Sequence, residues 1–523
     1  MTKIKSAFRT PHFAFVAVLA VFTYFFGLWL PFFGPDEPRY AQVAREMFER
    51  GDWVTPMLGG FNWFEKPSLL YWTQIASFNV FGVSEYAARI GPALFGLGTI
   101  ASLWIFGRKS EPSAVADGLT NATRHSFANW LAVIAASTLG ILVFSRGASF
   151  DITVTFPLTA AMVSFYVFDI SQQKRPVAIV PGSDQDGGST LPLILFYFFI
   201  GVAVLAKGLI GIVFPFAIVF LYQLLSWRRP STKLVLSFLG GTLVIVAVAG
   251  IWYLPMYLKH GWPFIDEFFV QHHFQRFTSN KYQHPQPFYF YLWVLPLMTL
   301  PWLPFFFAGC WKVLRGIVSS QVSETHGKSD LRITSSPLLL FAFSWIAIPL
   351  AFFSLSGSKL PGYILPAVPP AIIIAAWYIF GLVAESGVWR KVILGVASAV
   401  FLVSIVLLVT AVPKFADFDS VRGLIADAAA QGYRDERVFG LHTISHSAEF
   451  YAAGRLLRDV NGQQKKLYSP AEVATEMQRA NVRLSLVLVP PEYLTQLTGS
   501  SVFRRIEVIR SNGEWVIVAV ALD

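Results

Sequence analysis

Charged side chains are scarce in this chain. Only 14% of its 523 residues are Asp, Glu, Lys or Arg, and 54% are hydrophobic. A soluble globular protein carries about 25% charged residues. Apolar runs of about 18 residues or more recur along the sequence, and each can cross a membrane as a helix. The composition therefore excludes an ordinary soluble domain and predicts a polytopic α-helical membrane protein.

Cysteine is nearly absent, because Cys310 is the only one. A single thiol excludes an intrachain disulfide and a zinc site built on several cysteines. The formal net charge is +10, but no basic tract is interleaved with aromatic residues. We interpret the excess of Lys and Arg as the charge that orients membrane loops, and we expect no nucleic-acid partner.

Eleven apolar segments have the length of a membrane span, taking about 20 residues per span. They lie near 12–33, 88–107, 127–145, 152–170, 191–206, 208–226, 234–256, 288–310, 336–354, 361–383 and 392–412. Short helices hidden in 69–82 raise the expected range to about 11–13. The first segment follows Lys3, Lys5 and Arg9, but it is too long for a signal peptide and no small-residue cleavage site ends it. We therefore expect a retained first helix whose start is cytoplasmic.

Basic residues follow the alternation that this order requires, since cytoplasmic loops carry the excess of Lys and Arg. Every predicted cytoplasmic connection holds at least two of them, as in Arg228, Arg229 and Lys233 between the sixth and seventh spans. The opposite, periplasmic side then receives loop 34–87 and the tail. After about Val412 the sequence becomes polar and mixed, and segments such as RLSLVLV and SPAEVATEMQRA read as strands and helices. We expect a transmembrane domain at 1–412 and a periplasmic α/β domain at 413–523.

Loop 34–87 concentrates charge beside the first span. Its segment PDEPRYAQVAREMFERG predicts an amphipathic surface helix that ends at Gly51. Asp36 and Glu37 begin it, and two interpretations remain open: a helix cap with its dipole partner, or a general base or metal-binding carboxylate. Asp151 also invites an N-cap interpretation. However, it and Arg146 are the only charged side chains between Arg124 and Asp169, and charges at membrane depth are usually functional.

Several cations fall on the predicted external face, where few are expected. They are Lys66, Lys207, Arg276 and Lys359. Each has an ordinary explanation, such as a local ion pair of Lys66 with Glu65 or snorkelling of Lys207. Together they suggest a cluster that faces a lipid phosphate. His272 and His273 could bind a metal with Glu65, but neighbouring helical residues point about 100° apart, so one histidine at most joins a given site.

The segment DEPRYAQVAREMFERGDWVTPMLGGFNWFEKPSLLYW resembles the first external loop of the aminoarabinose transferases that modify lipid A. The later blocks AKGLIGIVFP, HHFQRFT, PWLPFF and SKLPGYILP follow in that family's order, so the resemblance covers roughly residues 10–410. The family belongs to the polyprenyl-phosphate-sugar glycosyltransferases, which include the protein O-mannosyltransferases. The resemblance implies a GT-C type fold with external surface helices and a cavity that opens to the periplasm.

The resemblance also implies roles for individual residues. Asp36 and Asp151 match the family's two essential aspartates. The positions expected to hold the donor phosphate are Arg39, Lys66, Arg276 and Tyr363. Glu65 and His273 fall where the family can place a divalent metal, although this chain has His272-His273 where the family often has Glu-His. Further candidates from the charge pattern are Glu37, Lys207 and Lys359.

The function that we predict is that of an inverting glycosyltransferase in a bacterial inner membrane. It would move a sugar, for example 4-amino-4-deoxy-L-arabinose, from undecaprenyl phosphate to lipid A or another envelope acceptor at the periplasmic face. Membrane lipids are the other expected partners, and a divalent metal is left open. The alternatives are an enzyme like the protein O-mannosyltransferases and a transporter or flippase of polyprenyl-linked sugars. A transporter typically shows paired repeats, and the sequence has no visible repeat.

Overall fold

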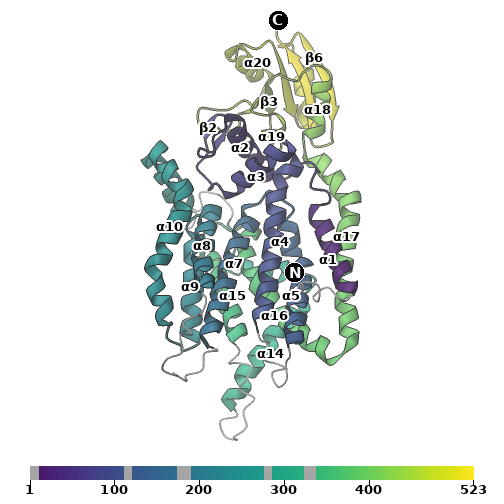
Figure 1. The fold of residues 1–523 in the computed structure, drawn as a ribbon. Coiled ribbons are helices and arrows are strands. Elements are labelled where there is room, and N and C mark those ends of the chain that lie inside the picture. The colour runs from purple at the N-terminus through teal and green to yellow at the C-terminus, as the bar shows by residue number, and fades with distance from the viewer. Residues whose placement is uncertain (1–10, 111–120, 174–189, 276–284, 323–336) are drawn as a thin grey trace. The chain divides into compact units, whose positions relative to one another are not determined.

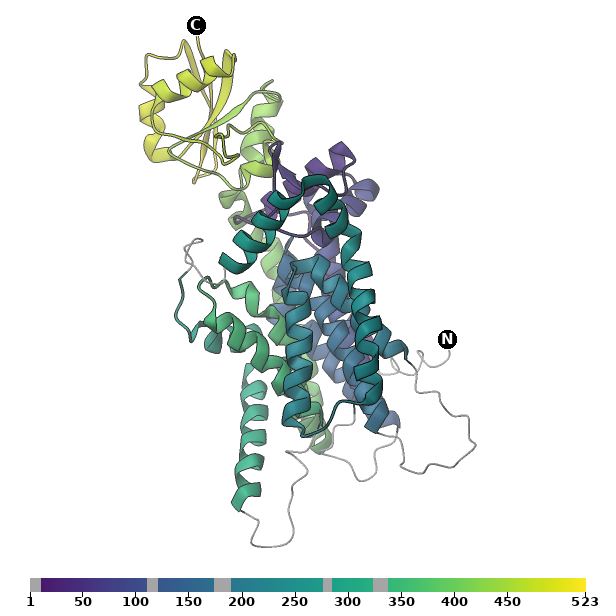
Figure 2. The same cartoon turned by 90° about the vertical axis from the view of Figure 1, so that its left-hand side faces the viewer.

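The computed structural model of the chain (Figure 1) describes residues 11–110, 121–173, 190–275, 285–322 and 337–523. Most of them are helical, and the apolar helices run side by side in two perpendicular views (Figures 1 and 2). Outside the loop after the first span and the C-terminal sheet region, the described helices are α1 (Pro11–Phe25), α4 (Glu85–Lys109), α5 (Asn121–Ala136), α6 (Leu139–Phe144), α7 (Phe150–Gln173), α8 (Leu191–Lys207), α9 (Ile210–Leu225), α10 (Thr232–His260), α11 (Trp262–Ile265), η2 (Asp266–Gln275), α13 (Phe290–Met298), α14 (Leu303–Val322), α15 (Pro337–Leu355), η4 (Pro361–Ala367), α16 (Val368–Glu385) and α17 (Gly387–Asp419).

The chain is a multi-pass membrane protein. Among the described residues, six helices are long and apolar enough to cross a membrane, and the bent pair α13–α14 would be a seventh. Four shorter apolar helices, α1, α5, α8 and α9, cover the remaining predicted segments. Each of the eleven segments therefore contains an apolar helix, while the number of actual crossings stays a prediction. The predicted fold class is confirmed.

Helix α7 lies in the interior of the apolar bundle, because 78% of its most apolar window is buried, against 11% for α10. It packs against α8 and the short helix η4. Aromatic side chains fill the space around it: Phe165 and Tyr166 both contact the ring of Phe341. This packing carries the first turn of α7, with Asp151, into the protein rather than toward lipid.

The segment after the first span forms α2 (Glu37–Arg50), the hairpin strands β1 (Met57–Leu58) and β2 (Phe61–Asn62), and α3 (Leu69–Phe81). The predicted apolar face of α2 is confirmed, because Tyr40, Val43, Ala44 and Met47 are all buried. Gly51 ends this helix with φ of 64°, and its amide donates to carbonyls of the last turn. A left-handed glycine in this position is a common helix stop.

The predicted C-terminal α/β fold is confirmed as a five-stranded sheet with strand order β4-β3-β5-β7-β6. The first three strands in that order are parallel, and the β5–β7 and β7–β6 pairs are antiparallel. The strands are β3 (Val438–Leu441), β4 (Lys466–Leu467), β5 (Leu484–Val489), β6 (Arg505–Ser511) and β7 (Val516–Ala521). The accompanying helices are α18 (Arg422–Ala430), α19 (Ala448–Tyr451), α20 (Pro470–Arg479), η5 (Pro491–Tyr493) and α21 (Leu494–Thr498). Separate apolar clusters contain Val487 and Leu486, neighbours on β5 that point to opposite faces.

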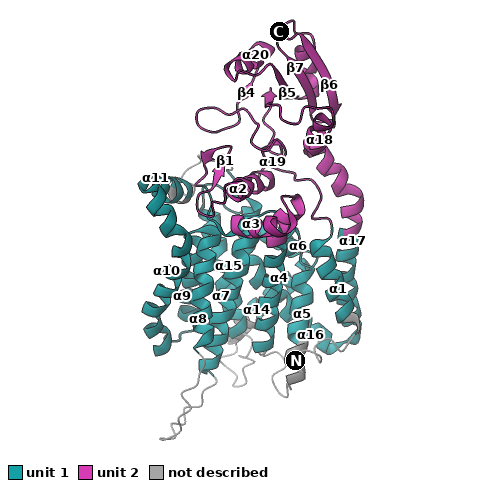
Figure 3. Cartoon of the chain, turned by 45° about the horizontal axis from the view of Figure 1, so that its top comes forward, with its two compact units in different colours: residues 1–26, 65–70, 92–404 teal, residues 27–64, 71–91, 405–523 magenta. Residues whose placement is uncertain are grey.

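Two compact units emerge from the contacts between residues (Figure 3). Unit 1 comprises Met1–Phe26, Glu65–Leu70 and Pro92–Ser404, and unit 2 comprises Gly27–Phe64, Tyr71–Gly91 and Ile405–Asp523. The boundary that we predict at 412/413 rests on composition alone. The units instead group the α2 region and the start of α4 with the C-terminal residues.

Candidate functional site

Asp36 occupies the N-cap position of α2, with φ of −92° and ψ of −46°. Within the described residues its side chain makes no capping hydrogen bond, so the helix-cap interpretation does not account for it. The carboxylate accepts a hydrogen bond from the Tyr40 hydroxyl at 3.3 Å and lies 3.8 Å from the Arg39 guanidinium. The side chain is 55% exposed, so a reacting group can reach it.

Arg39 stands one turn into the same helix. Its guanidinium donates to the carbonyl of Pro35 at 3.2 Å and lies 5.7 Å from the centroid of the Trp63 ring, just past the β1–β2 hairpin. A guanidinium over an indole ring makes a favourable cation–π contact, which also orients the N–H donors of the guanidinium. The first turn of α2 and the hairpin thus present an acidic and a basic group side by side.

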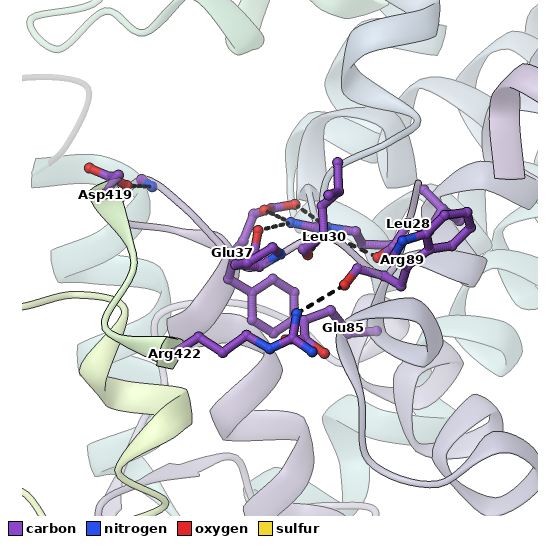
Figure 4. Close-up of polar contacts among 12 residues, drawn as sticks. Leu28, Leu30, Glu37, Glu85, Arg89, Asp419 and Arg422 are labelled. Carbon is purple, nitrogen blue, oxygen red and sulfur yellow. Dashed lines mark hydrogen bonds and ion pairs between the residues drawn. The ribbon is translucent and has the colours of Figure 1, made fainter. Parts of the chain in front are cut away.

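Glu37 has a different environment from Asp36. Its carboxylate binds Arg89 through two hydrogen bonds of 2.5 and 3.1 Å, and the Arg89 side chain is only 3% exposed (Figure 4). The same guanidinium donates to the backbone carbonyls of Leu28, Leu30 and Pro31 at 3.0, 2.6 and 3.2 Å. A buried charge with this many partners is well satisfied. Glu37 therefore serves to hold the chain before α2.

A second group of predicted residues meets within unit 1. The Asp151 carboxylate, on the first turn of α7, forms an ion pair with Lys207, the last residue of α8. The Lys207 ammonium lies 4.8 Å from the centroid of the Tyr363 ring. Gly362 lies directly against the carboxylate, since a Cβ atom there would be 2.0 Å from Asp151 Oδ2. The structure thus joins Asp151, Lys207 and Tyr363 from three helices.

Lys359 is buried and bound to backbone oxygens. Its ammonium donates to the carbonyls of Ser356 and Gln286 at 2.6 and 3.0 Å, and the Tyr291 hydroxyl donates to the next carbonyl, that of Leu360, at 2.9 Å. These bonds fix the loop that leads into η4 and Tyr363. Lys359 is therefore bound to the backbone of this loop, and its role in a functional site stays a prediction.

Glu65 and Lys66 form the predicted local ion pair, at 3.0 Å, and both side chains are mostly buried. Arg276 lies outside the described residues, and so does the side chain of His273. The described residues gather no set of three or more His, Cys, Asp or Glu side chains that could hold a metal ion. Because an ammonium already pairs with Glu65, we derive no step through a metal, and the Glu65–His273 site stays a prediction.

Several residues of the α2 environment escape the sequence analysis: Glu85, Arg89, Asp419, Arg422 and Tyr451. Arg89 could have been identified from the sequence, because it is a charged residue inside an apolar span and an acidic residue precedes it by four positions. The Tyr451 hydroxyl donates to Glu85 at 2.9 Å. Burial, with the Glu85 charge as the next cause, raises the pKa of Tyr451, so its hydroxyl stays protonated and remains a donor.

Residues 13–265 match the family profile described as dolichyl-phosphate-mannose-protein mannosyltransferase. A relative from Aeromonas salmonicida is 32% identical over 352 residues, which cover 66% of this chain and 56% of the relative. One from Serratia proteamaculans is 32% identical over 349 residues, covering 66% and 54%. Both are named undecaprenyl phosphate-alpha-4-amino-4-deoxy-L-arabinose arabinosyl transferase. The chain spans about half the length of these relatives.

Solved structures give the same fold over nearly the whole chain. ArnT from Cupriavidus metallidurans bound to undecaprenyl phosphate matches with a TM-score of 0.73 at 20% identity, and the match covers 98% of both chains. The apo state of that protein matches with a TM-score of 0.71 over 97% of both chains. The chain is thus similar to these aminoarabinose transferases over about two thirds of its length, shares the fold of ArnT, and matches the protein-mannosyltransferase profile at residues 13–265.

Proposed function

We propose that this protein is an inverting glycosyltransferase that moves a sugar from undecaprenyl phosphate to an envelope acceptor, with lipid A as the first choice. The named relatives support the donor and the sugar, 4-amino-4-deoxy-L-arabinose. The observation that carries the proposal is the exposed Asp36 carboxylate, which stands beside Arg39 without serving as a helix cap. We place the reaction at the periplasmic face of a bacterial inner membrane, with the C-terminal sheet on that side.

The donor's lipid phosphate is the leaving group, and its charge grows as the bond to the sugar breaks. Preorganised cations stabilise such charge better than water does. We assign this role to Arg39, Lys66 and Arg276, with the Tyr363 hydroxyl as a further donor. Lys207 pairs with Asp151 and lies 4.8 Å from the centroid of the Tyr363 ring, so it adds positive charge beside that residue. A guanidinium can bind two phosphate oxygens at once, which an ammonium cannot.

The acceptor oxygen attacks the sugar carbon from the side opposite the phosphate, so one displacement inverts that centre. If the acceptor is a hydroxyl, Asp36 accepts its proton as the C–O bond forms. If the acceptor is a phosphate oxygen, there is no proton to remove, and Asp36 orients the acceptor instead. Asp151, held by Lys207, orients the sugar or the acceptor. Each of these roles is assigned to a side chain of the protein itself.

A protein acceptor is the second candidate, because the profile that matches residues 13–265 is named for protein mannosylation. The two candidates share the donor phosphate and differ in the acceptor. Offering purified protein both lipid A and unstructured peptides rich in Ser and Thr, with the same donor, distinguishes them. A glycosylated peptide with unchanged lipid A would favour the second candidate.

The test of the main proposal is transfer in vitro. Purified protein in lipid vesicles is given undecaprenyl phosphate-4-amino-4-deoxy-L-arabinose and lipid A, and the products are weighed by mass spectrometry. The wild-type protein should add the sugar, and Asp36→Asn should add none while it still melts normally and binds undecaprenyl phosphate. Glu49→Gln is the matched control, because Glu49 is an exposed acid of the same helix that pairs with Arg45. Near-normal turnover by Asp36→Asn would overturn the role of that residue.

A further inference from the structure

We propose that the C-terminal domain positions Asp36, through three side chains that bind the backbone leading into α2. These side chains are Asp419, Arg422 and Tyr451, and we call them the clasp. They belong to the same compact unit as Asp36. The inference rests on the proposed function in that Asp36 must take part in the transfer. None of the clasp residues needs to touch a substrate, so they are positioning residues.

The clasp binds the chain at three points between the first span and α2. The Arg422 guanidinium donates to the carbonyl of Trp29 at 3.3 Å. The amide of Phe32 donates to the Tyr451 hydroxyl at 2.8 Å. The amide of Gly34 donates to the Asp419 carboxylate at 2.7 Å. The last of these contacts lies two residues before Asp36.

The bound segment has no regular secondary structure between α1 and α2. Its backbone groups therefore need partners from elsewhere in the protein. Arg89 supplies donors for three of its carbonyls, as described above, and the clasp supplies acceptors for two of its amides. Gly34 has φ of 71°, a left-handed turn that a side chain rarely adopts. The direction in which the chain enters α2 is thus set by these contacts.

Glu85 ties two of the three clasp residues, Arg422 and Tyr451, to each other. The Glu85 carboxylate accepts from the Tyr451 hydroxyl at 2.9 Å and lies 3.3 Å from Arg422 (Figure 4). The ring of Phe450, the residue before this tyrosine, packs edge to face on the ring of Phe32, with the ring centroids 4.9 Å apart. Helix α19, which carries both aromatic residues, packs against α2. The contacts therefore form one continuous network from the C-terminal domain to α2.

The position of Asp419 is fixed by the sheet. The amide nitrogen of the Asn512 side chain, in the turn between β6 and β7, donates to the carbonyls of Asp417, Phe418 and Ser420 at 3.0, 2.9 and 3.0 Å. These carbonyls lie at the end of α17, where a helix leaves several of them without intrahelical partners. The hairpin of the sheet thus holds the residues on either side of Asp419, and Asp419 holds Gly34.

The geometry points to positioning because Asp36 is only weakly held by its own helix. Its side chain is more than half exposed and makes no capping bond to the backbone of α2, and its contacts there are the 3.3 Å bond from the Tyr40 hydroxyl and the 3.8 Å approach of Arg39. The direction of the preceding backbone therefore decides where its carboxylate points. A misplacement of about 1 Å at a reacting group can cost about a hundredfold in rate. Loss of the clasp should accordingly lower the rate of the chemical step before it weakens binding of the donor lipid.

The experiment compares Tyr451→Phe, Asp419→Ala and Asp419→Asn in purified full-length protein. Tyr451→Phe and Asp419→Ala should each lower kcat by about ten- to a hundredfold. The KM for the donor and the Kd for undecaprenyl phosphate should stay within about twofold of wild type. Asp419→Asn keeps an acceptor oxygen for the Gly34 amide and should restore kcat to within about threefold. Asp427→Ala is the control, because Asp427 forms an exposed ion pair with Arg510 in the same domain.

Hydrogen exchange of the Phe32 and Gly34 amides gives a readout that is independent of activity. Both amides should exchange faster in Tyr451→Phe and Asp419→Ala, and Asp419→Asn should protect Gly34 again. Faster exchange with unchanged kcat would overturn the inference and leave the proposed function intact. Unchanged exchange in both variants would overturn it as well. If kcat, lipid affinity and melting temperature all fell together, the clasp would only stabilise the fold, and its positioning role would be rejected. If wild type transfers no sugar, it is the proposed function that fails.

Discussion

The guanidinium of Arg89 binds a carboxylate and three backbone carbonyls while almost fully buried. Removal of one partner from such a group leaves the other charge buried and unpaired, which costs about 3–5 kcal/mol. We therefore expect Arg89→Met to lower the stability by that amount. The double variant Arg89→Met with Glu37→Met should recover part of the loss, because the orphaned carboxylate is then gone. Chemical unfolding of the purified single and double variants measures both values, and additive losses would contradict the coupling.

His446 lies in the loop before α19, and its charge neighbours come from several elements of unit 2. Burial, followed by the charge of Arg39, lowers the pKa of His446 from its ordinary value of 6.5, against the opposing effects of Glu449, Asp36 and Asp419. The folded state thus prefers the neutral ring. Below about pH 6.5 the unfolded state binds more protons at this site, so the folded state loses stability as the pH falls.

The expected result is a pH-dependent melting temperature that depends in part on this ring. The melting temperature should fall between pH 8 and pH 5, and His446→Gln should make the fall shallower. Equal slopes in wild type and His446→Gln would show that the ring does not contribute. Because the side chain is partly exposed, we expect a small effect.

Asp36 and Glu37 show what single residues disclose before a structure is known. From the sequence alone, both a structural and a chemical interpretation of the pair are open. The choice between them depends on Arg89, which is 52 residues from Glu37, so local patterns do not contain it. The same holds for Asp151 and Lys207, 56 residues apart, which the sequence singled out separately. Residue types were predictable, whereas their partners were not.

At the scale of elements, the contact between η4 and α7 decides how closely Tyr363 approaches Asp151. Gly362 allows it, because a Cβ atom would lie 2.0 Å from the Asp151 carboxylate and 2.7 Å from the Phe144 ring. We expect Gly362→Ala to separate the two helices and lower turnover by about tenfold or more. Gly381→Ala is the matched control, since a Cβ atom there has nothing within 4 Å. The sugar-transfer assay measures both, and equal activity would contradict the close-packing argument.

Apolar runs predicted the helices well, because hydrophobic length is a local property of the sequence. The break within 288–310 was missed. The structure has two helices there, α13 and α14, that meet at an angle of 116°. Pro301 lies in the break between them, and proline removes a backbone donor that a continuous helix needs. Because the residues on both sides of the break are apolar, hydrophobicity alone indicates one continuous span.

For the whole molecule, the grouping of the α2 region with the C-terminal residues was beyond prediction. The two hydrogen bonds that join Phe32 and Gly34 to the C-terminal domain connect residues 419 and 385 positions apart. The composition changes sharply near Val412, so it predicts a domain boundary there. It does not indicate which residues far apart in the sequence are in contact. The C-terminal strands were predictable for the opposite reason. Runs such as LSLVLV are short, mostly apolar and bounded by Arg483 and Pro490.

The side of the membrane on which the C-terminal domain lies can be tested by fusion. Basic loops and an odd number of predicted spans predict that it lies in the periplasm. Alkaline phosphatase attached after Asp523 should therefore be active. The same enzyme attached after Arg229, in a predicted cytoplasmic loop, should be inactive and serves as the control. An inactive fusion at Asp523, together with an active cytoplasmic reporter at the same position, would reverse the topology.

The bonds of Arg89 to Leu28, Leu30 and Pro31 end on backbone oxygens, which every amino acid provides. Side chains at those three positions can therefore drift during evolution while the arginine stays, and no correlated substitution records the contact. The bond of Arg89 to Glu37 joins two side chains and is expected to leave such a record. Methods that infer contacts from covariation would thus recover the Glu37 pair and overlook the backbone that the same guanidinium holds.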